Sequence, residues 1–184
     1  MKTVKGLHEK MGTFENANIS FHQAARCKRY TEEVLAFSMV KEEELLRAAE
    51  EIKSLTYRQG EYRVFKVFEP KERLIMALPF YDRVVQHMIC NVIQPVFEAG
   101  FYYHSYACRL GKGMHAASDT LYQWLYETQE KQGLRMYAFK GDISKYFASI
   151  PHAGLKAENR RYIGDRKALS LMDDIIDRNG ILPD

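Results

Sequence analysis

One stretch decides how this sequence is interpreted: Phe139-Lys140-Gly141-Asp142-Ile143-Ser144-Lys145-Tyr146-Phe147. The apolar pattern from Met136 to Ile143 predicts a buried β-strand, with one carboxylate, that of Asp142, near its end. Burying a carboxylate costs free energy unless a cation or a metal ion pairs with it. The pattern is therefore typical either of an aspartate that caps the turn after the strand or of an acid with a chemical role.

A β-hairpin is expected upstream, over residues 62–76. Its strands are rich in β-branched and aromatic residues, and Glu69-Pro70-Lys71-Glu72 has the composition of a turn. Three cations lie at or near the turn: Lys66, Lys71 and Arg73. They are compatible with an anion-binding group or with charges that guard a solvated strand edge.

Helical periodicity dominates the rest of the chain. The strongest stripe runs from Phe80 to Phe97, with Asp82, Arg83, Gln86 and His87 on the polar face. Further helices are predicted over 14–29, from Thr31 as an N-cap, over 41–55, around Ala116–Leu125 with Gly133 closing the helix, and over about 165–178. The stripes of 80–97 and 116–125 are expected to build a core together with the hairpin and the 136–143 strand.

Composition bounds the class of protein. The chain has 184 residues, of which 46% are hydrophobic and 28% charged, so it is globular rather than disordered, collagen-like or disulfide-rich. A net charge of +3 permits nucleic-acid binding without requiring it. The cysteines, Cys27, Cys90 and Cys108, are few and widely spaced, which favours reduced thiols in the cytoplasm. Neither a secretion signal nor a membrane span is expected, and hence no membrane partner.

The run Lys140–His152 resembles motif A of bacterial reverse transcriptases, as found in group II introns, retrons and diversity-generating retroelements. Three upstream blocks resemble the fingers motifs of the same family: Pro70–Ile75, Phe80–Gln86, and Pro95–Glu98 followed by Ser105–Gly113. These blocks occur in the family's order and cover about residues 55–155. One block alone is weak, whereas four in order are specific.

The resemblance implies an α+β fold and a partial polymerase right hand: helical fingers with a β-hairpin and the first palm strand. Residues 1–60 would form an N-terminal helical extension, 61–135 the fingers and 136–184 the start of the palm. The implied activity is that of an RNA-directed DNA polymerase, a nucleotidyltransferase that uses an RNA template, a DNA primer and dNTPs. An alternative is a non-catalytic RNA or RNA/DNA-binding module of the same fold.

Individual residues take their roles from the same resemblance. Asp142 matches the first of two catalytic aspartates that hold two Mg²⁺ ions, and hard carboxylate oxygens suit that metal. Ile143 matches a residue whose backbone carbonyl also touches metal and the nucleotide site, and Phe147 matches the bulky gate that excludes a ribose 2′-hydroxyl. Lys66 and Arg73, with Lys71 as a third, match cations that hold the incoming triphosphate.

A second group matches a stretch that contacts the template: Arg109, Gly111, Lys112 and Gly113. Glycines allow close backbone approach to phosphates, and the cations supply charge. A plain exposed turn is the alternative for this loop.

The family's second metal-binding motif, Tyr-X-Asp-Asp, is the main departure. Leu171-Met172-Asp173-Asp174 looks similar but falls on an amphipathic pattern whose acids point away from the apolar stripe. We therefore expect a surface helix there. The chain is expected to be a fragment with the fingers and the start of the palm, inactive by itself, whose exposed apolar surface would favour self-association.

Overall fold

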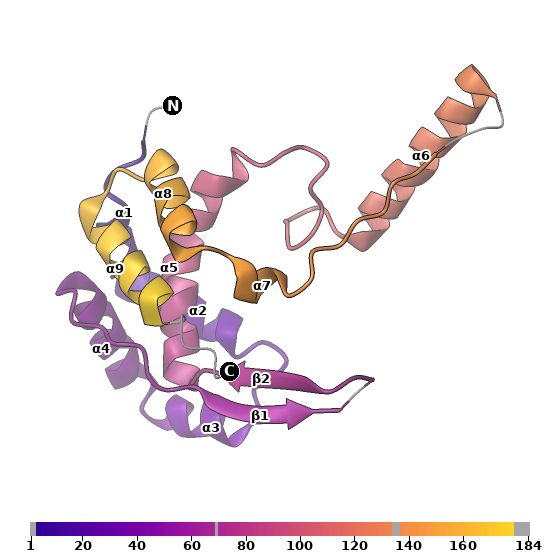
Figure 1. Ribbon diagram of the computed structural model, residues 1–184. Helices are drawn as coiled ribbons and strands as arrows, with labels where there is room; N and C mark the ends of the chain where they lie inside the picture. Colours follow the sequence, from indigo (N-terminus) through magenta and orange to yellow (C-terminus); the bar gives the residue numbers. More distant parts are fainter. Residues whose placement is uncertain (1–2, 69, 134–136, 179–184) are drawn as a thin grey trace. The chain divides into compact units, whose positions relative to one another are not determined.

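The computed structural model describes residues 3–68, 70–133 and 137–178 (Figure 1). The fold is α+β, with helices and one antiparallel two-stranded hairpin, as predicted. The elements are α1 (Leu7–Met11), α2 (Phe14–Ala24), α3 (Glu32–Met39), α4 (Lys41–Lys53), β1 (Arg63–Val67), β2 (Arg73–Ala77), α5 (Phe80–Glu98), α6 (Met114–Gln132), α7 (Tyr146–Ser149), α8 (His152–Tyr162) and α9 (Arg166–Arg178).

The chain divides into two compact units. The first consists of Met1–Val96 together with Ile150–Asp184, and the second of Phe97–Ser149. The domain boundaries expected from the sequence, at residues 60 and 135, remain predictions.

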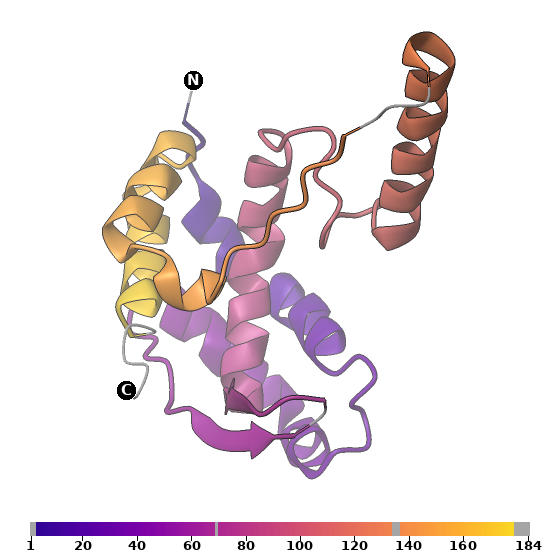
Figure 2. The same cartoon turned by 45° about the vertical axis from the view of Figure 1, so that its right-hand side comes forward.

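The first unit holds the hydrophobic core. Helix α5 runs through its middle, with α2 on one side and α4 and α9 on the other (Figures 1 and 2). The largest fully buried side chains are Met11, Val34, Leu45, Ile52, Val84, Val85, Met88 and Ile163. The predicted stripe of α4 is confirmed, since Leu45, Ala48, Ala49 and Ile52 are all buried. In α5 the buried part of the stripe ends at Ile89.

Asp82 was expected on the polar face of α5 and is instead buried, with 3% of its surface exposed. Its Oδ1 accepts hydrogen bonds from the Tyr57 hydroxyl, at 2.7 Å, and from the Gly60 amide, at 3.2 Å. These donors compensate for the lost hydration of the carboxylate. Asp82 thereby ties the segment before β1 to the first turn of α5.

The predicted helix over 14–29 ends early, at Ala24. Residues 25–30 form turns, and Cys27 has a left-handed backbone with φ 61°. Helices α1 and α8 were not predicted. Helix α1 has only five residues, too few for a periodic pattern, and α8 has little apolar periodicity to reveal it.

The hairpin prediction over 62–76 is confirmed by β1 and β2. The strands pair in the register Arg63↔Ala77, Phe65↔Ile75 and Val67↔Arg73. The predicted turn residue Glu69 lies outside the described residues.

The second unit contains α6, whose apolar stripe was expected to contribute to a core. Gly133 closes α6 as predicted, with φ 80°. However, the large apolar side chains of its expected stripe, Leu121, Trp124 and Leu125, are exposed. A periodic pattern shows which face of a helix is apolar, but burial also requires a partner surface.

Across residues 3–68, 70–133 and 137–178, none of the helices combines the length and the apolar character needed to cross a membrane.

Candidate functional site

The segment with Asp142 is the first candidate site. Residues 137–143 form neither helix nor strand, so the predicted buried strand is wrong for its described part; Met136 lies outside the described residues. Tyr137 and Phe139 are 95% and 97% exposed. A strand needs a neighbour for its backbone hydrogen bonds, and in the described part of the chain only β1 and β2 pair as a sheet.

Asp142 is followed by the predicted tight turn. Residues 144 and 145 form this turn, and Lys145 has φ 50°, which turns the chain into α7. Phe147 in α7 is 88% exposed and stands edge-on to Tyr146, with ring centroids 5.3 Å apart. Asp142, Ile143 and Phe147 are therefore all accessible within six residues.

Asp142 meets part of what a site for two metal ions requires. Its carboxylate is a hard oxygen donor and suits Mg²⁺. Within the described residues, however, no cluster of three or more histidine, cysteine, aspartate or glutamate side chains could hold a metal ion. The site as described thus offers one acid where two Mg²⁺ ions require several.

The hairpin cations belong to the first unit. The ammonium of Lys66 forms an ion pair with Glu72 Oε1 at 2.6 Å, and both side chains are more than half exposed. Lys66 is opposite Leu74, and Arg73 is opposite Val67. Because side chains alternate between the two faces of a strand, Lys66 and Arg73 point to opposite faces of the hairpin. Both lie beside the turn, and Lys71 is exposed within it.

Arg109, a predicted template contact, organises its own loop. Its Nε donates to Glu98 Oε1 at 2.6 Å, and its Nη1 donates to the carbonyls of Tyr102 and Ser105 at 2.8 and 3.0 Å. Only 9% of the side chain is exposed. Sequence reasoning missed Glu98 as the partner, although an acid at the end of an apolar helix was the available signal.

Lys112 and its flanking glycines end this loop, with Gly111 exposed and Lys112 and Gly113 partly exposed. Gly111 and Gly113 have φ of 68° and 139°, conformations that other residues rarely adopt, and a Cβ at either position would meet open space. The Lys112 ammonium donates to the Tyr103 carbonyl and lies 3.9 Å from the centroid of the Tyr103 ring. The positive φ explains why glycine occupies both positions, while contact with a template phosphate stays a prediction.

An aromatic cluster surrounds His104 in the second unit. The His104 ring lies 4.9 Å from the ring of Tyr103 and 4.6 Å from that of Trp124. Its Nδ1 shares a hydrogen bond with the Tyr106 hydroxyl, which donates to Thr120 Oγ1 on α6 at 2.8 Å. Tyr102 and Tyr103 keep most of their surface exposed, so their rings are available for stacking.

The two acids that mimic the second metal motif lie on α9, as expected. Ala168, Leu171 and Met172 of this helix are buried. Asp173 pairs with Arg160, and Asp174 Oδ2 is 3.8 Å from Arg58 Nη1. The predicted surface helix is confirmed, and both acids are engaged in ion pairs within the first unit.

Comparison with known proteins shows a partial similarity. No family model matches the chain. The chain is 31% identical over 91 residues to Protein YkfC of Escherichia coli (strain K12), which is 50% of this chain and 23% of that protein. The chain thus spans less than a quarter of the relative it matches, and the name of that relative states no activity.

Proposed function

We propose that this chain is the N-terminal portion of an RNA-directed DNA polymerase of a bacterial retroelement, comprising fingers and the start of the palm. The observation that carries the proposal is the motif A resemblance of Lys140–His152, preceded in order by three fingers-like blocks. The alternative, a non-catalytic nucleic-acid-binding module, shares the resemblance and differs only in chemistry.

The accessibility of the motif A segment supports the proposal. Asp142 and Phe147 are both exposed and are separated by a tight turn. A carboxylate must be accessible to bind a metal ion that also contacts substrate, and a side chain must be accessible to exclude a ribose hydroxyl sterically. A merely structural aspartate would be expected to cap the turn that follows it, and the hydrogen bonds of the described residues include no such cap by Asp142.

The hairpin supports a role in holding nucleotide phosphates. Lys66, Lys71 and Arg73 gather at an exposed turn, where long cationic side chains can reach a triphosphate. Because Lys66 and Arg73 lie on opposite faces, a shared triphosphate would be held around the end of the hairpin rather than across one face.

Under this proposal the intact protein binds two Mg²⁺ ions, which supply charge neutralisation and nucleophile activation when bound. Asp142 and the Ile143 carbonyl would contribute to holding them, and further acids would come from outside the described residues. Activity in the cytoplasm agrees with three cysteines that are free and exposed.

Primer extension by the full-length protein tests the proposal. The assay uses an RNA template, a DNA primer, dNTPs and Mg²⁺, and it compares wild type with Asp142→Asn and with Asp119→Asn. Asp119 is an exposed acid of α6 in the same unit and serves as the matched control. We expect extension by wild type and Asp119→Asn and loss of extension by Asp142→Asn. Nucleic-acid binding without extension by wild type would favour the binding module.

A further inference from the structure

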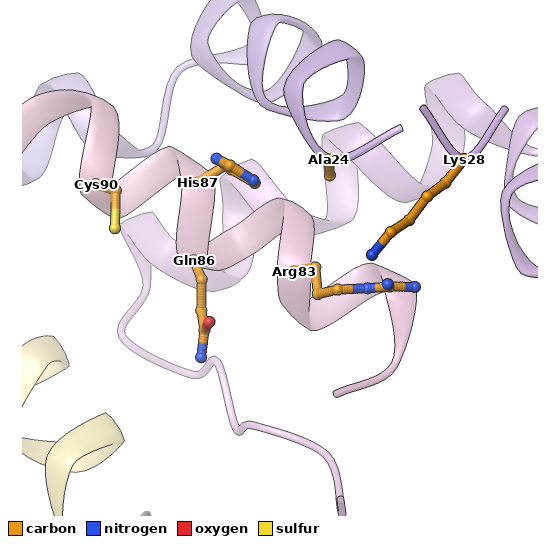
Figure 3. Close-up of a pocket in the computed structure, with 6 residues that line it drawn as sticks. All are labelled: Ala24, Lys28, Arg83, Gln86, His87 and Cys90. Atoms are coloured by element: carbon orange, nitrogen blue, oxygen red, sulfur yellow. The ribbon is translucent and has the colours of Figure 1, made fainter. Parts of the chain in front are cut away.

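A small basic pocket lies between the C-terminal end of α2 and one face of α5 (Figure 3). Its volume is about 220 Å³, and it is lined by Ala24, Lys28, Arg83, Gln86, His87 and Cys90. The four α5 residues occur at spacings of three, four and seven, so they share one side of the helix. The pocket belongs entirely to the first unit and contains none of the residues assigned to polymerase chemistry.

Two cations converge in this pocket. Figure 3 shows the Lys28 ammonium directed towards the guanidinium of Arg83. The hydrogen bonds and ion pairs of the described residues include none for the Lys28 side chain. Glu33 neutralises only one of the two cations, because it pairs with Arg83 Nη2. Two cations that lie close together repel each other, and Glu33 leaves one positive charge unbalanced. An anion bound between them would relieve this repulsion.

The Arg83 guanidinium keeps donors to offer. It carries five N–H groups, and Glu33 accepts from one nitrogen. Its Nε is buried and has no hydrogen-bond partner. His87 adds a nearby ring whose pKa is lowered by burial, so the imidazole is neutral at pH 7 and donates one N–H. Gln86 also lines the pocket, but its side-chain amide already donates to Gln59 Oε1 at 3.3 Å.

The turn that carries Lys28 is fixed in place. The Lys28 amide donates to the Ala25 carbonyl, and the Lys28 carbonyl accepts from the Thr31 amide, both at 3.0 Å. Cys27, directly before Lys28, has a left-handed backbone conformation that turns the chain at this point. A fixed backbone lowers the entropy that the site loses when a ligand binds.

We propose that this pocket binds a phosphate group through Lys28, Arg83 and His87. Its volume is below the range of roughly 300–1,000 Å³ typical of pockets that enclose whole drug-sized ligands, so it suits a single tetrahedral oxyanion. The phosphate can be free inorganic phosphate or part of a nucleic-acid backbone, and both present the same oxygens. The site is independent of polymerase activity.

Titration of the 184-residue chain at constant ionic strength tests this site. The probes are inorganic phosphate and a single-stranded RNA oligomer, followed by NMR shifts of the His87 ring and by calorimetry. The test variant is Lys28→Gln, an exposed position. The control is Arg26→Gln, which removes the same charge from the same turn outside the pocket.

We expect saturable binding that Lys28→Gln weakens at least about fivefold and Arg26→Gln less than about twofold. Saturation by inorganic phosphate identifies a free oxyanion as a sufficient ligand. Saturation by RNA alone, with the same dependence on Lys28, assigns the site to a strand backbone. The proposal is overturned if neither probe saturates, or if both variants weaken binding equally, because binding would then follow net charge alone.

Discussion

The Asp165 carboxylate accepts a hydrogen bond from the backbone amide of His8 at 3.0 Å, across 157 positions of sequence. The same oxygen, Oδ2, accepts from the Leu7 amide at 2.8 Å, while Oδ1 accepts from the amides of Lys167 and Ala168. One side chain thus caps the N-termini of both α1 and α9. It joins the start of the first unit to the segment that returns after the second.

Asp165→Ala should destabilise the first unit by about 1–3 kcal/mol, because two helices lose their N-caps together. Urea unfolding followed by circular dichroism measures the change. Asp174→Ala is the matched control, since Asp174 lies on α9 but forms only an exposed pair at 3.8 Å; its effect should stay within about 0.5 kcal/mol. Equal effects of the two substitutions would contradict the double-cap role.

The free energy of unfolding should also fall at acidic pH, because the Asp165 carboxylate becomes protonated. Burial raises its pKa, but four backbone amide bonds outweigh burial and hold the pKa below its ordinary value of 3.8. A carboxyl with a lowered folded-state pKa stabilises the fold above the ordinary value, and this contribution disappears as pH falls through the folded-state pKa. Unfolding free energy measured from pH 6 to pH 2 should therefore drop less in Asp165→Ala than in wild type below about pH 4.

The sequence predicted those elements whose residue pattern is local, that is, contained within the element itself. The stripe of α4 and the alternation of the hairpin report local periodicity, and both elements formed where expected. The sequence did not predict structural features that depend on contacts between residues far apart in the chain. The burial of Asp82 requires Tyr57, the loop around Arg109 requires Glu98, and α1 requires Asp165.

The same reason explains the failure of the strand around Asp142. An apolar run predicts burial only where a second surface covers it, and in the described part of the chain no strand pairs with residues 137–143. The tight turn at residues 144–145, by contrast, is a local property and formed as predicted.

Asp173→Asn combined with Asp174→Asn should retain most polymerase activity in the full-length protein. Both acids lie on α9 and pair with Arg160 and Arg58, and exposed pairs of this kind contribute only about 0–1 kcal/mol to stability. Primer extension should therefore stay within about threefold of wild type, whereas Asp142→Asn should lose about a hundredfold or more. An inactive double variant beside an active Asp142→Asn would reverse the assignment of the metal acid.

Lys66→Ala should raise the KM for dNTPs about tenfold, because one charge-assisted contact to phosphate is lost. Arg63→Ala is the control: Arg63 lies on the same strand but at the end away from the turn, paired with Ala77. Steady-state extension kinetics distinguish the two. If Lys66→Ala weakens only the affinity for the template, Lys66 contacts the nucleic acid and does not bind the nucleotide.

Arg109→Ala should loosen the loop between α5 and α6. The substitution removes the bonds to Glu98, Tyr102 and Ser105, and it leaves the partly buried Glu98 without its cation, at a cost of about 2–3 kcal/mol. Amide hydrogen exchange over residues 99–113 should accelerate in this variant. Lys112→Ala, which removes one bond to the Tyr103 carbonyl from the same loop, should accelerate the exchange of these amides less than Arg109→Ala does.

Measurements of RNA affinity distinguish two possible roles of Arg109, holding the loop and contacting the template. If the residue acts by holding the loop, Arg109→Ala accelerates exchange, and any loss of RNA affinity accompanies that loosening. Arg109→Lys should then also accelerate exchange, because an ammonium cannot reproduce the guanidinium's bonds to one carboxylate and two carbonyls. If Arg109 instead contacts the template directly, Arg109→Ala reduces RNA affinity with exchange unaltered, and Arg109→Lys preserves much of the affinity through its charge.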